Sequence, residues 1–174
     1  MTRINCFIPA GGQGVWDHTL DEFKSGGLVN RVFIMGPETP AKLAPGVTFL
    51  KTSARQSTEA IRMIADRSAD ADFTMIVTGE APVSFGMLAL ERFIQVAVDM
   101  DAALVYSDHF DLLEGKLSPH PLIDYQAGSL RDDFEFGPVL LFKSQELIAA
   151  AGELKDDLQF AALYQLRLKL SLLS

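Results

Sequence analysis

The feature that most constrains the fold is a short apolar run that stops abruptly at a polar tripeptide. Residues Phe73–Val77 (FTMIV) favour a β-strand, and Thr78-Gly79-Glu80 follows directly. A continuous apolar run of this length is typical of a strand that is buried on both faces, as in a parallel sheet. Open α/β sheets bind ligands in the crevice outside the carboxyl ends of their strands. The sequence therefore predicts that Glu80 lies at the mouth of a binding crevice.

Strand-like and helix-like segments alternate along the rest of the chain. Further strands are predicted at residues 4–9, 29–35, 47–51, 102–106 and 136–143. Helices are predicted at residues 18–25, 57–69, 85–100, 144–151 and 156–173, and residues 111–128 form an irregular stretch with a hairpin turn at Glu114-Gly115-Lys116. This alternation indicates an α/β fold of three layers, α/β/α, with a mostly parallel central sheet. We expect one domain over residues 1–174, or the N-terminal part of a longer protein.

Charge and cysteine content restrict the partners. The net charge of the 174 residues is −8 and no cluster of basic residues occurs, so a nucleic-acid partner is not expected. The single cysteine, Cys6, cannot form an intrachain disulfide, which favours a cytoplasmic protein. No segment is long and apolar enough to predict a membrane span. The final helix is apolar on nearly every side, which predicts that it is buried, packs against a second subunit, or continues into a missing region.

A glycine-rich loop follows the first predicted strand. Pro9-Ala10 is followed by Gly11-Gly12-Gln13-Gly14, and backbone N–H groups in such a loop can approach a phosphate. The spacing matches neither the phosphate-binding P-loop nor the dinucleotide-binding fingerprint. A ligand-binding loop and a plain turn both remain open at this stage.

Acidic side chains follow two of the predicted strands. Glu80 and Asp108 can together hold Mg²⁺ or Mn²⁺, because these ions take oxygen ligands and bridge to phosphates. The alternative is that Glu80 caps a turn and Asp108 begins a loop. Arg55 and Arg131 are the loop cations best placed to meet a phosphate.

Two further groups of polar residues have weaker patterns. Asp156 and Asp157 precede the last predicted helix, where they can favour the helix dipole or act as a catalytic base. His18, His109 and His120 are far apart in the sequence and lack metal-ligand spacing, so no histidine site is predicted.

The chain from Ala103 onward resembles glycosyltransferase family 2 domains. The shared features are a strand that ends in Tyr106-Ser107-Asp108, a turn that ends in Gly115-Lys116, a proline-containing stretch and a strand rich in leucine and phenylalanine. The resemblance implies the GT-A fold, a nucleotide diphosphate sugar donor, a glycan acceptor and a divalent metal, Mg²⁺ or Mn²⁺. The sequence departs from the family in two places. The paired acids that hold the nucleoside in the family are replaced by Gly36-Pro37-Glu38, and in the metal motif only Glu80 is acidic.

The resemblance also implies roles for individual residues. The residues expected to bind the donor are Pro9, Ala10, Glu38, Arg55 and Thr78, and Arg55 is expected to bind its phosphates. The residues expected to bind the metal are Glu80 and Asp108. The catalytic residues are Asp157, as the base that takes the acceptor's proton, and its neighbour Asp156.

A second resemblance lies in Ile8–Gly14 (IPAGGQG), which is similar to the start of sugar nucleotidyltransferases. Those enzymes place an arginine after the glycines, where this chain has Val15-Trp16-Asp17. The leading hypothesis is therefore a glycosyltransferase. The alternatives are a sugar nucleotidyltransferase and a non-catalytic domain that binds a nucleotide sugar or a protein partner.

Overall fold

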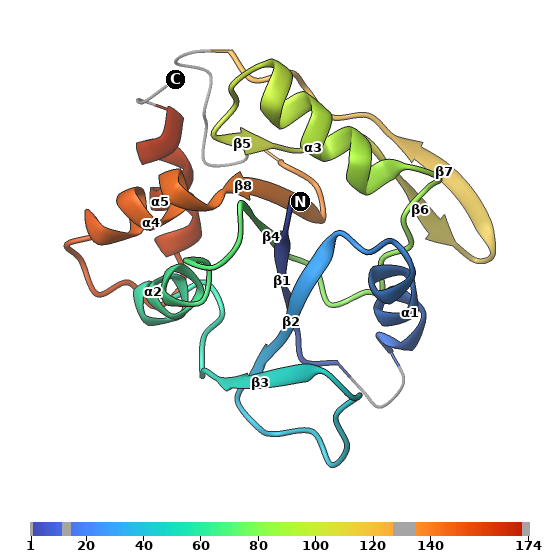
Figure 1. Ribbon diagram of the computed structural model, residues 1–174, viewed down its shortest axis with the longest axis horizontal. Coiled ribbons are helices and arrows are strands. Elements are labelled where there is room, and N and C mark those ends of the chain that lie inside the picture. Colours follow the sequence, from blue (N-terminus) through green and yellow to red (C-terminus); the bar gives the residue numbers. More distant parts are fainter. Residues whose placement is uncertain (1, 12–14, 127–134, 172–174) are drawn as a thin grey trace.

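The computed structural model describes residues 2–11, 15–126 and 135–171, and it shows a six-stranded sheet between two layers of helices (Figure 1). The strands of this sheet are β1 (Ile4–Pro9), β2 (Val29–Gly36), β3 (Val47–Lys51), β4 (Phe73–Val77), β5 (Leu104–Val105) and β8 (Val139–Lys143). Their spatial order is β3-β2-β1-β4-β8-β5. The predicted strands thus form one sheet, although the last two are shorter than predicted.

The sheet is mostly parallel, which confirms the prediction. Strands β1, β2, β3 and β4 run in the same direction, and β8 is antiparallel to both of its neighbours, β4 and β5. The described residues of the connection from β5 to β8, 106–126 and 135–138, contain a hairpin and no helix. The antiparallel pairing of β8 fits a connection of this kind, because a parallel pairing usually needs a crossover helix.

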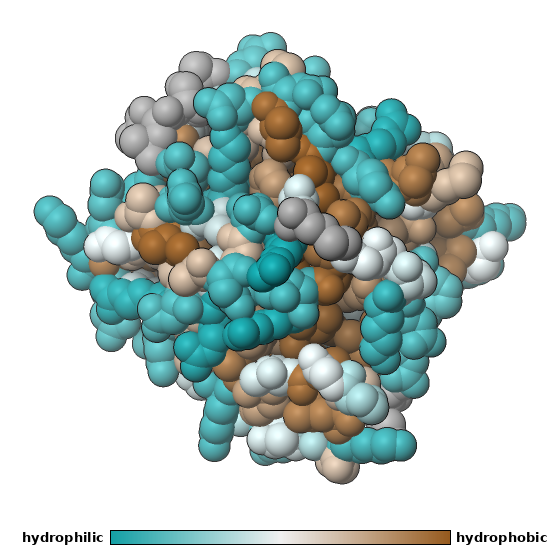
Figure 2. Space-filling model, viewed as in Figure 1, coloured by the Kyte–Doolittle hydropathy of each residue, from teal (hydrophilic) through white to brown (hydrophobic). Residues whose placement is uncertain are grey.

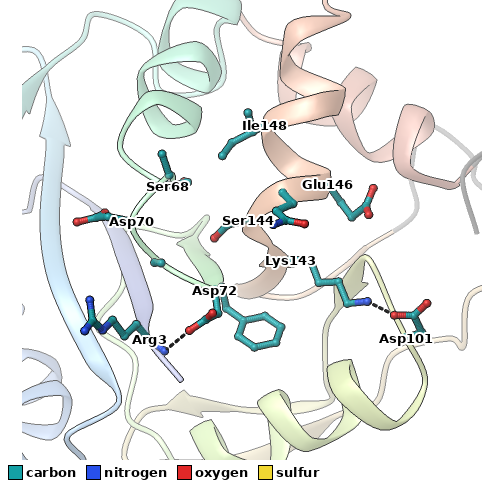
Figure 3. Close-up of a pocket in the computed structure, with 13 residues that line it drawn as sticks. Arg3, Ser68, Asp70, Asp72, Asp101, Lys143, Ser144, Glu146 and Ile148 are labelled. Atoms are coloured by element: carbon teal, nitrogen blue, oxygen red, sulfur yellow. Dashed lines mark hydrogen bonds and ion pairs between the residues drawn. The ribbon is translucent and has the colours of Figure 1, made fainter. Parts of the chain in front are cut away.

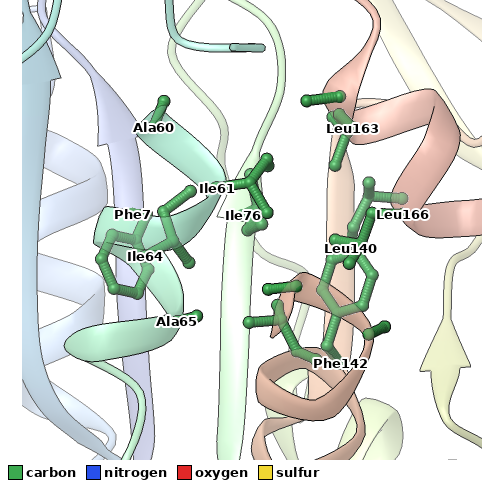
Figure 4. Close-up of a cluster of buried hydrophobic side chains, with 14 of the residues drawn as sticks. Phe7, Ala60, Ile61, Ile64, Ala65, Ile76, Leu140, Phe142, Leu163 and Leu166 are labelled. Atoms are coloured by element: carbon green, nitrogen blue, oxygen red, sulfur yellow. The ribbon is translucent and has the colours of Figure 1, made fainter. Parts of the chain in front are cut away.

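Alternate side chains along the strands enter two separate cores. Phe7, Phe33 and Ile76 point to one face, where they pack with helices α2 (Thr58–Asp66), α4 (Ser144–Gly152) and α5 (Ala162–Ser171). Figure 4 shows Phe7 and Ile76 among the buried side chains of this core. Cys6 and Met75 point to the other face, which is covered by α1 (Asp17–Ser25) and α3 (Ala89–Asp99). Both faces of the central strands are therefore buried, as their continuous apolar runs indicate.

The helix after β3 begins as the sequence predicts. The Ser57 side chain accepts a hydrogen bond of 3.1 Å from the backbone N–H of Ala60, which satisfies one of the free donors at the start of α2. On the other face, α3 begins at Ala89 rather than at residue 85, after Leu88 in a left-handed conformation with φ of 58°.

The final helix is shorter than predicted, because it begins at Ala162 and not at Asp156. The hydroxyl of Thr58 donates to the backbone oxygen of Asp156 at 2.7 Å and accepts from the N–H of Leu158 at 3.0 Å. These contacts with α2 replace the hydrogen bonds that a helix would make there. From Ala162 on, Leu163, Leu166 and Leu170 are buried in the core shared with α2 and α4, which accounts for much of the apolar character of α5 within one chain.

A two-stranded hairpin, β6 (His109–Leu113) and β7 (Lys116–His120), occupies most of the stretch that was predicted to be irregular. The turn prediction is confirmed, since Glu114 and Gly115 both have positive φ, 49° and 76°, as a tight two-residue hairpin turn requires. Hydrophobic side chains gather on the surface of this hairpin (Figure 2). They are Phe110, Leu112, Leu113 and Leu117. No helix among the described residues is long and apolar enough to cross a membrane.

Candidate functional site

The chain that leaves β1 lies tightly against the end of β2. The N–H of Ala10 donates to the carbonyl of Met35 at 2.7 Å. A Cβ atom added to Gly36 would lie only 2.5 Å from the Cβ of Ala10, so this close approach requires glycine. Pro9 and Ala10, both predicted to line a nucleoside, are thereby fixed at the carboxyl edge of the sheet. Gly12, Gln13 and Gly14 of the predicted loop lie outside the described residues.

The carboxyl edge carries an ion pair between two residues that were predicted to have separate roles. The guanidinium of Arg55 donates to Glu80 with an Nη2–Oε1 distance of 2.7 Å, and the two side chains are 32% and 77% exposed. Arg55 comes from the connection between β3 and α2, and Glu80 from the loop after β4. The structure thus places a cation and an acid together where a phosphate was predicted to bind.

Arg55 and Thr78 line one small cavity together with Pro9 and Leu163. Its volume is about 40 Å³, which is room for a water molecule and not for a nucleotide. Thr78 is fixed at its rim, because its N–H donates to the carbonyl of Pro138 at 2.9 Å and its hydroxyl donates to that of Gly137 at 3.2 Å. Three predicted donor-binding residues, Pro9, Arg55 and Thr78, are therefore neighbours.

The remaining predicted ligands have different surroundings. Glu38 is exposed, two residues beyond the end of β2. The carboxylate of Asp108 accepts a hydrogen bond of 2.7 Å from the N–H of Leu122, so it ties the start of the hairpin to the chain that leaves it. A metal shared by Glu80 and Asp108 remains a prediction. Arg131, the second cation proposed for a phosphate, lies outside the described residues.

Asp156 and Asp157 lie in the loop between α4 and α5, and not at the start of the last helix. The carboxylate of Asp156 accepts from Gln165 Nε2 at 3.2 Å, and Asp157 is exposed. The end of this segment reaches the candidate site, because the N–H of Ala162 donates to the carbonyl of Gln56, the residue after Arg55. The role of either aspartate as a base stays a prediction.

The expectation that the histidines form no set is wrong. His109 and His120 face each other across the hairpin, and their rings stack with centroids 4.3 Å apart. Asp111 bonds to His120 at 2.8 Å, which raises the pKa of His120 and lowers that of Asp111. The sequence held a usable signal: a two-residue turn at Glu114-Gly115 pairs residue 113 with 116 and, by counting back, 109 with 120.

A larger hollow of about 830 Å³ lies at the opposite, amino edge of the sheet (Figure 3). Its lining includes both acids and cations, among them Arg3, Asp72, Asp101 and Lys143. Asp72 accepts from the backbone N–H of Arg3 at 2.8 Å, and Lys143 is bonded to Asp101. This hollow lies at the wrong end of the strands for ligand binding by an open α/β sheet. The carboxyl edge is the better candidate site.

Comparison with solved structures supports the fold at low sequence identity. Neither a protein-family model nor a curated protein sequence matches this chain. The bifunctional IspDF from Campylobacter jejuni aligns with 97% of the chain at 12% identity and a TM-score of 0.58, and the chain spans 47% of that protein. A 2-C-methyl-D-erythritol 4-phosphate cytidylyltransferase from Francisella tularensis aligns at 13% identity with a TM-score of 0.54, covering 97% of this chain and 87% of that one.

A third structure, a 4-diphosphocytidyl-2C-methyl-D-erythritol synthase, aligns with 97% of the chain at 18% identity and a TM-score of 0.52, and the chain covers 86% of it. At such identities the likeness shows a shared fold, and the predicted three-layer architecture is confirmed. The chain covers about half of the first of these structures and most of the other two.

Proposed function

We propose that this chain is a nucleotidyltransferase that binds a nucleoside triphosphate at the carboxyl edge of its sheet. The observation that carries the proposal is the fold, which the chain shares over 97% of its length with a protein named as a 2-C-methyl-D-erythritol 4-phosphate cytidylyltransferase. CTP is therefore the first nucleotide to test, and a phosphomonoester is the first class of acceptor. Glycosyl transfer, the leading hypothesis from the sequence, lacks comparable support and remains a prediction.

The proposed reaction is displacement at the α-phosphorus. An acceptor phosphate oxygen forms a new bond to this phosphorus while the bond to the bridging oxygen of the β-phosphate breaks, and pyrophosphate leaves with that electron pair. The chain would provide positioning and charge stabilisation, which dominate catalysis of phosphoryl-type transfers. Pro9 and Ala10 would line the nucleoside, and Arg55 would donate from its guanidinium to phosphate oxygens.

The residues at this edge are compatible with a divalent cation. Mg²⁺ is commonly held by one or two carboxylates together with substrate phosphates, and the exposed Glu80 offers such a carboxylate once it leaves Arg55. A cation bound there would supply neutralisation of the triphosphate charge. Glu80 would then exchange its pairing with Arg55 for the metal, while Arg55 turns to the phosphates.

Thermal-shift titrations test the proposal directly. We expect CTP with Mg²⁺ to stabilise the protein, and a nucleotide at a hundred times its Kd contributes about 2.7 kcal/mol. Pyrophosphate release in the presence of sugar or polyol phosphates then reports turnover. Arg55→Ala should remove the CTP response, whereas Arg92→Ala, an exposed arginine on α3, should retain it. A response to nucleoside diphosphate sugars alone would instead favour glycosyl transfer.

One observation favours a second candidate, a non-catalytic binding domain. The cavity beside Arg55 has room for about one water molecule, and Arg55 is neutralised by Glu80. In that case the thermal-shift assay would detect a ligand without any release of pyrophosphate.

A further inference from the structure

The base of the hairpin gathers side chains whose chemistry is that of a transition-metal site. His109 of β6 and His120 of β7 stack with a centroid distance of 4.3 Å and an angle of 21° between the ring planes. Glu135, from the segment before β8, brings its Oε2 atom within 3.3 Å of Nε2 of His120. One ligand atom from each of these three residues lies within 4.8 Å of the other two.

Asp111 fixes how His120 presents its ring. Its Oδ2 atom lies 2.8 Å from Nδ1 of His120. Because the aspartate accepts, Nδ1 carries the hydrogen, and Nε2 of the neutral ring then directs a lone pair at the carboxylate of Glu135. The 3.3 Å between Nε2 of His120 and Oε2 of Glu135 is bridged either by a proton on Nε2 or by a metal ion that both atoms bind. A histidine whose other nitrogen donates to a carboxylate is the usual arrangement around a bound metal.

His109 supplies a further nitrogen that the fold leaves available. Its side chain is 19% exposed, and its Nδ1 atom is buried without a hydrogen-bond partner among residues 2–11, 15–126 and 135–171. Its Nε2 atom lies 3.5 Å from Oδ1 of Asp111, the same carboxylate that orients His120. Buried ring nitrogens without a partner are costly, and metal coordination is one way to satisfy them.

We propose that His109, His120 and Glu135 bind a divalent transition-metal ion, zinc by the chemistry of the ligands, with Asp111 as a positioning residue. Two histidines and one carboxylate are a recognised zinc set that leaves an open coordination position. Ligand atoms of one tetrahedral zinc are roughly 3.4 Å apart. Glu135 and His120 already have this spacing, at 3.3 Å, and the group as a whole, whose atoms lie within 4.8 Å of one another, requires only a small adjustment. Imidazole nitrogens favour Zn²⁺ over Mg²⁺, which distinguishes this site from the cation proposed near Glu80.

The site would join the hairpin to the segment that precedes β8. His109 and His120 belong to the hairpin, and Glu135 lies three residues before Pro138, whose carbonyl accepts from the N–H of Thr78. A metal at this position would therefore fasten the hairpin to the segment that borders the candidate site. Such a crosslink predicts a higher melting temperature with zinc, because an ion that binds only the folded state stabilises it.

The test is a titration of the full chain with ZnCl₂ after treatment with EDTA and removal of the chelator. Isothermal calorimetry and elemental analysis should give about one zinc per chain. The double variant His109→Ala/His120→Ala should lose this zinc, and Asp111→Asn should bind it about 10–100-fold more weakly. The matched control is His18→Ala, which removes the remaining histidine of the chain, on α1, and should leave zinc binding unchanged.

Circular dichroism of each variant accompanies the titration, and Glu135→Gln at an exposed side chain provides a ligand deletion that does not alter the hairpin. Loss of zinc in Glu135→Gln with retained folding supports the site. Absence of zinc binding by the unaltered chain at micromolar zinc, or unchanged binding in both ligand variants, overturns it. The assay contains no nucleotide, so its result is independent of the proposed transferase activity.

Discussion

Arg55 and Glu80 form an ion pair, 2.7 Å between Nη2 and Oε1, across the carboxyl edge of the sheet. The two residues were predicted separately, one as a phosphate ligand and the other as a metal ligand. Their pairing means that any phosphate bound by Arg55 competes with Glu80. A divalent cation that draws Glu80 away would release Arg55, so binding of the cation and of the phosphate would help each other.

Removing the charge of Glu80 is expected to change nucleotide binding in opposite ways with and without magnesium. An exposed ion pair contributes about 0.2–1 kcal/mol, so Glu80→Gln should strengthen CTP binding without Mg²⁺ by a factor of about 1.5–5. With Mg²⁺ present, the same substitution should weaken binding, because a metal ligand is lost. Calorimetric titration of CTP under both conditions measures the two effects. Glu91→Gln, an exposed residue of α3, is the control, and equal affinities for Glu80→Gln and the unaltered chain would rule out both roles.

Adding a methyl group at Gly36 is expected to disturb the chain after β1. The added Cβ would lie 2.5 Å from Cβ of Ala10, a contact that only a backbone shift can relieve. Overpacking of this kind costs about 1–3 kcal/mol, so Gly36→Ala should lower the free energy of unfolding by that amount and weaken CTP binding through Pro9 and Ala10. Urea denaturation and thermal shift provide the two measurements. Gly86→Ala has open space around the new Cβ, and a loss there of equal size would contradict this account.

The central strands could be predicted because their pattern has one physical meaning. Phe73–Val77 is buried at every position, and a short run with no polar face fits only a strand covered on both sides. The direction of β8 could not be predicted, because its apolar residues read the same in a parallel or an antiparallel strand. That direction depends on the connection from β5, whose described residues contain a hairpin and no helix.

The parts of the site that could not be predicted all depend on contacts between distant residues. The local sequence predicts that a helix begins at Asp156, yet the hydroxyl of Thr58, 98 residues away, holds this residue in a loop. Arg55 and Glu80 each have a pattern suited to a ligand, and nothing in the sequence indicates that they satisfy each other. The pairing of His109 with His120 could have been predicted from the sequence, because the predicted turn already fixes the register of the hairpin.

Asp101 is expected to stabilise the fold in a pH-dependent way through Lys143. The hydrogen bond from Lys143, followed by the attraction of its charge, lowers the pKa of Asp101 below its usual value of about 4. A lowered pKa in the folded state means that the stabilisation is present above the unfolded pKa and is lost as the pH falls through the folded one. Asp101→Asn should therefore lower the melting temperature slightly at pH 7 and leave it unchanged at about pH 2.

Asparagine suits this position, because Asp101 has a φ of 51° and asparagine tolerates that left-handed conformation. The comparison is made by calorimetry at both pH values, with Asp99→Asn as the control on the same surface. A difference in melting temperature that persists at low pH would show that the effect of the substitution is not electrostatic.

Removing the hydroxyl of Thr58 is expected to loosen the loop that holds Asp156 and Asp157. This side chain is fully buried, donates to the carbonyl of Asp156 at 2.7 Å and accepts from the N–H of Leu158 at 3.0 Å. Thr58→Val keeps the shape and removes both hydrogen bonds, each of which contributes about 0.5–1.5 kcal/mol. Urea denaturation should show that loss, whereas Thr48→Val on the exposed edge strand β3 should change stability by less than about 0.5 kcal/mol. Hydrogen exchange should then increase at Leu158 and Ala162, and unchanged protection at these two amides would show that Thr58 does not hold the loop in place.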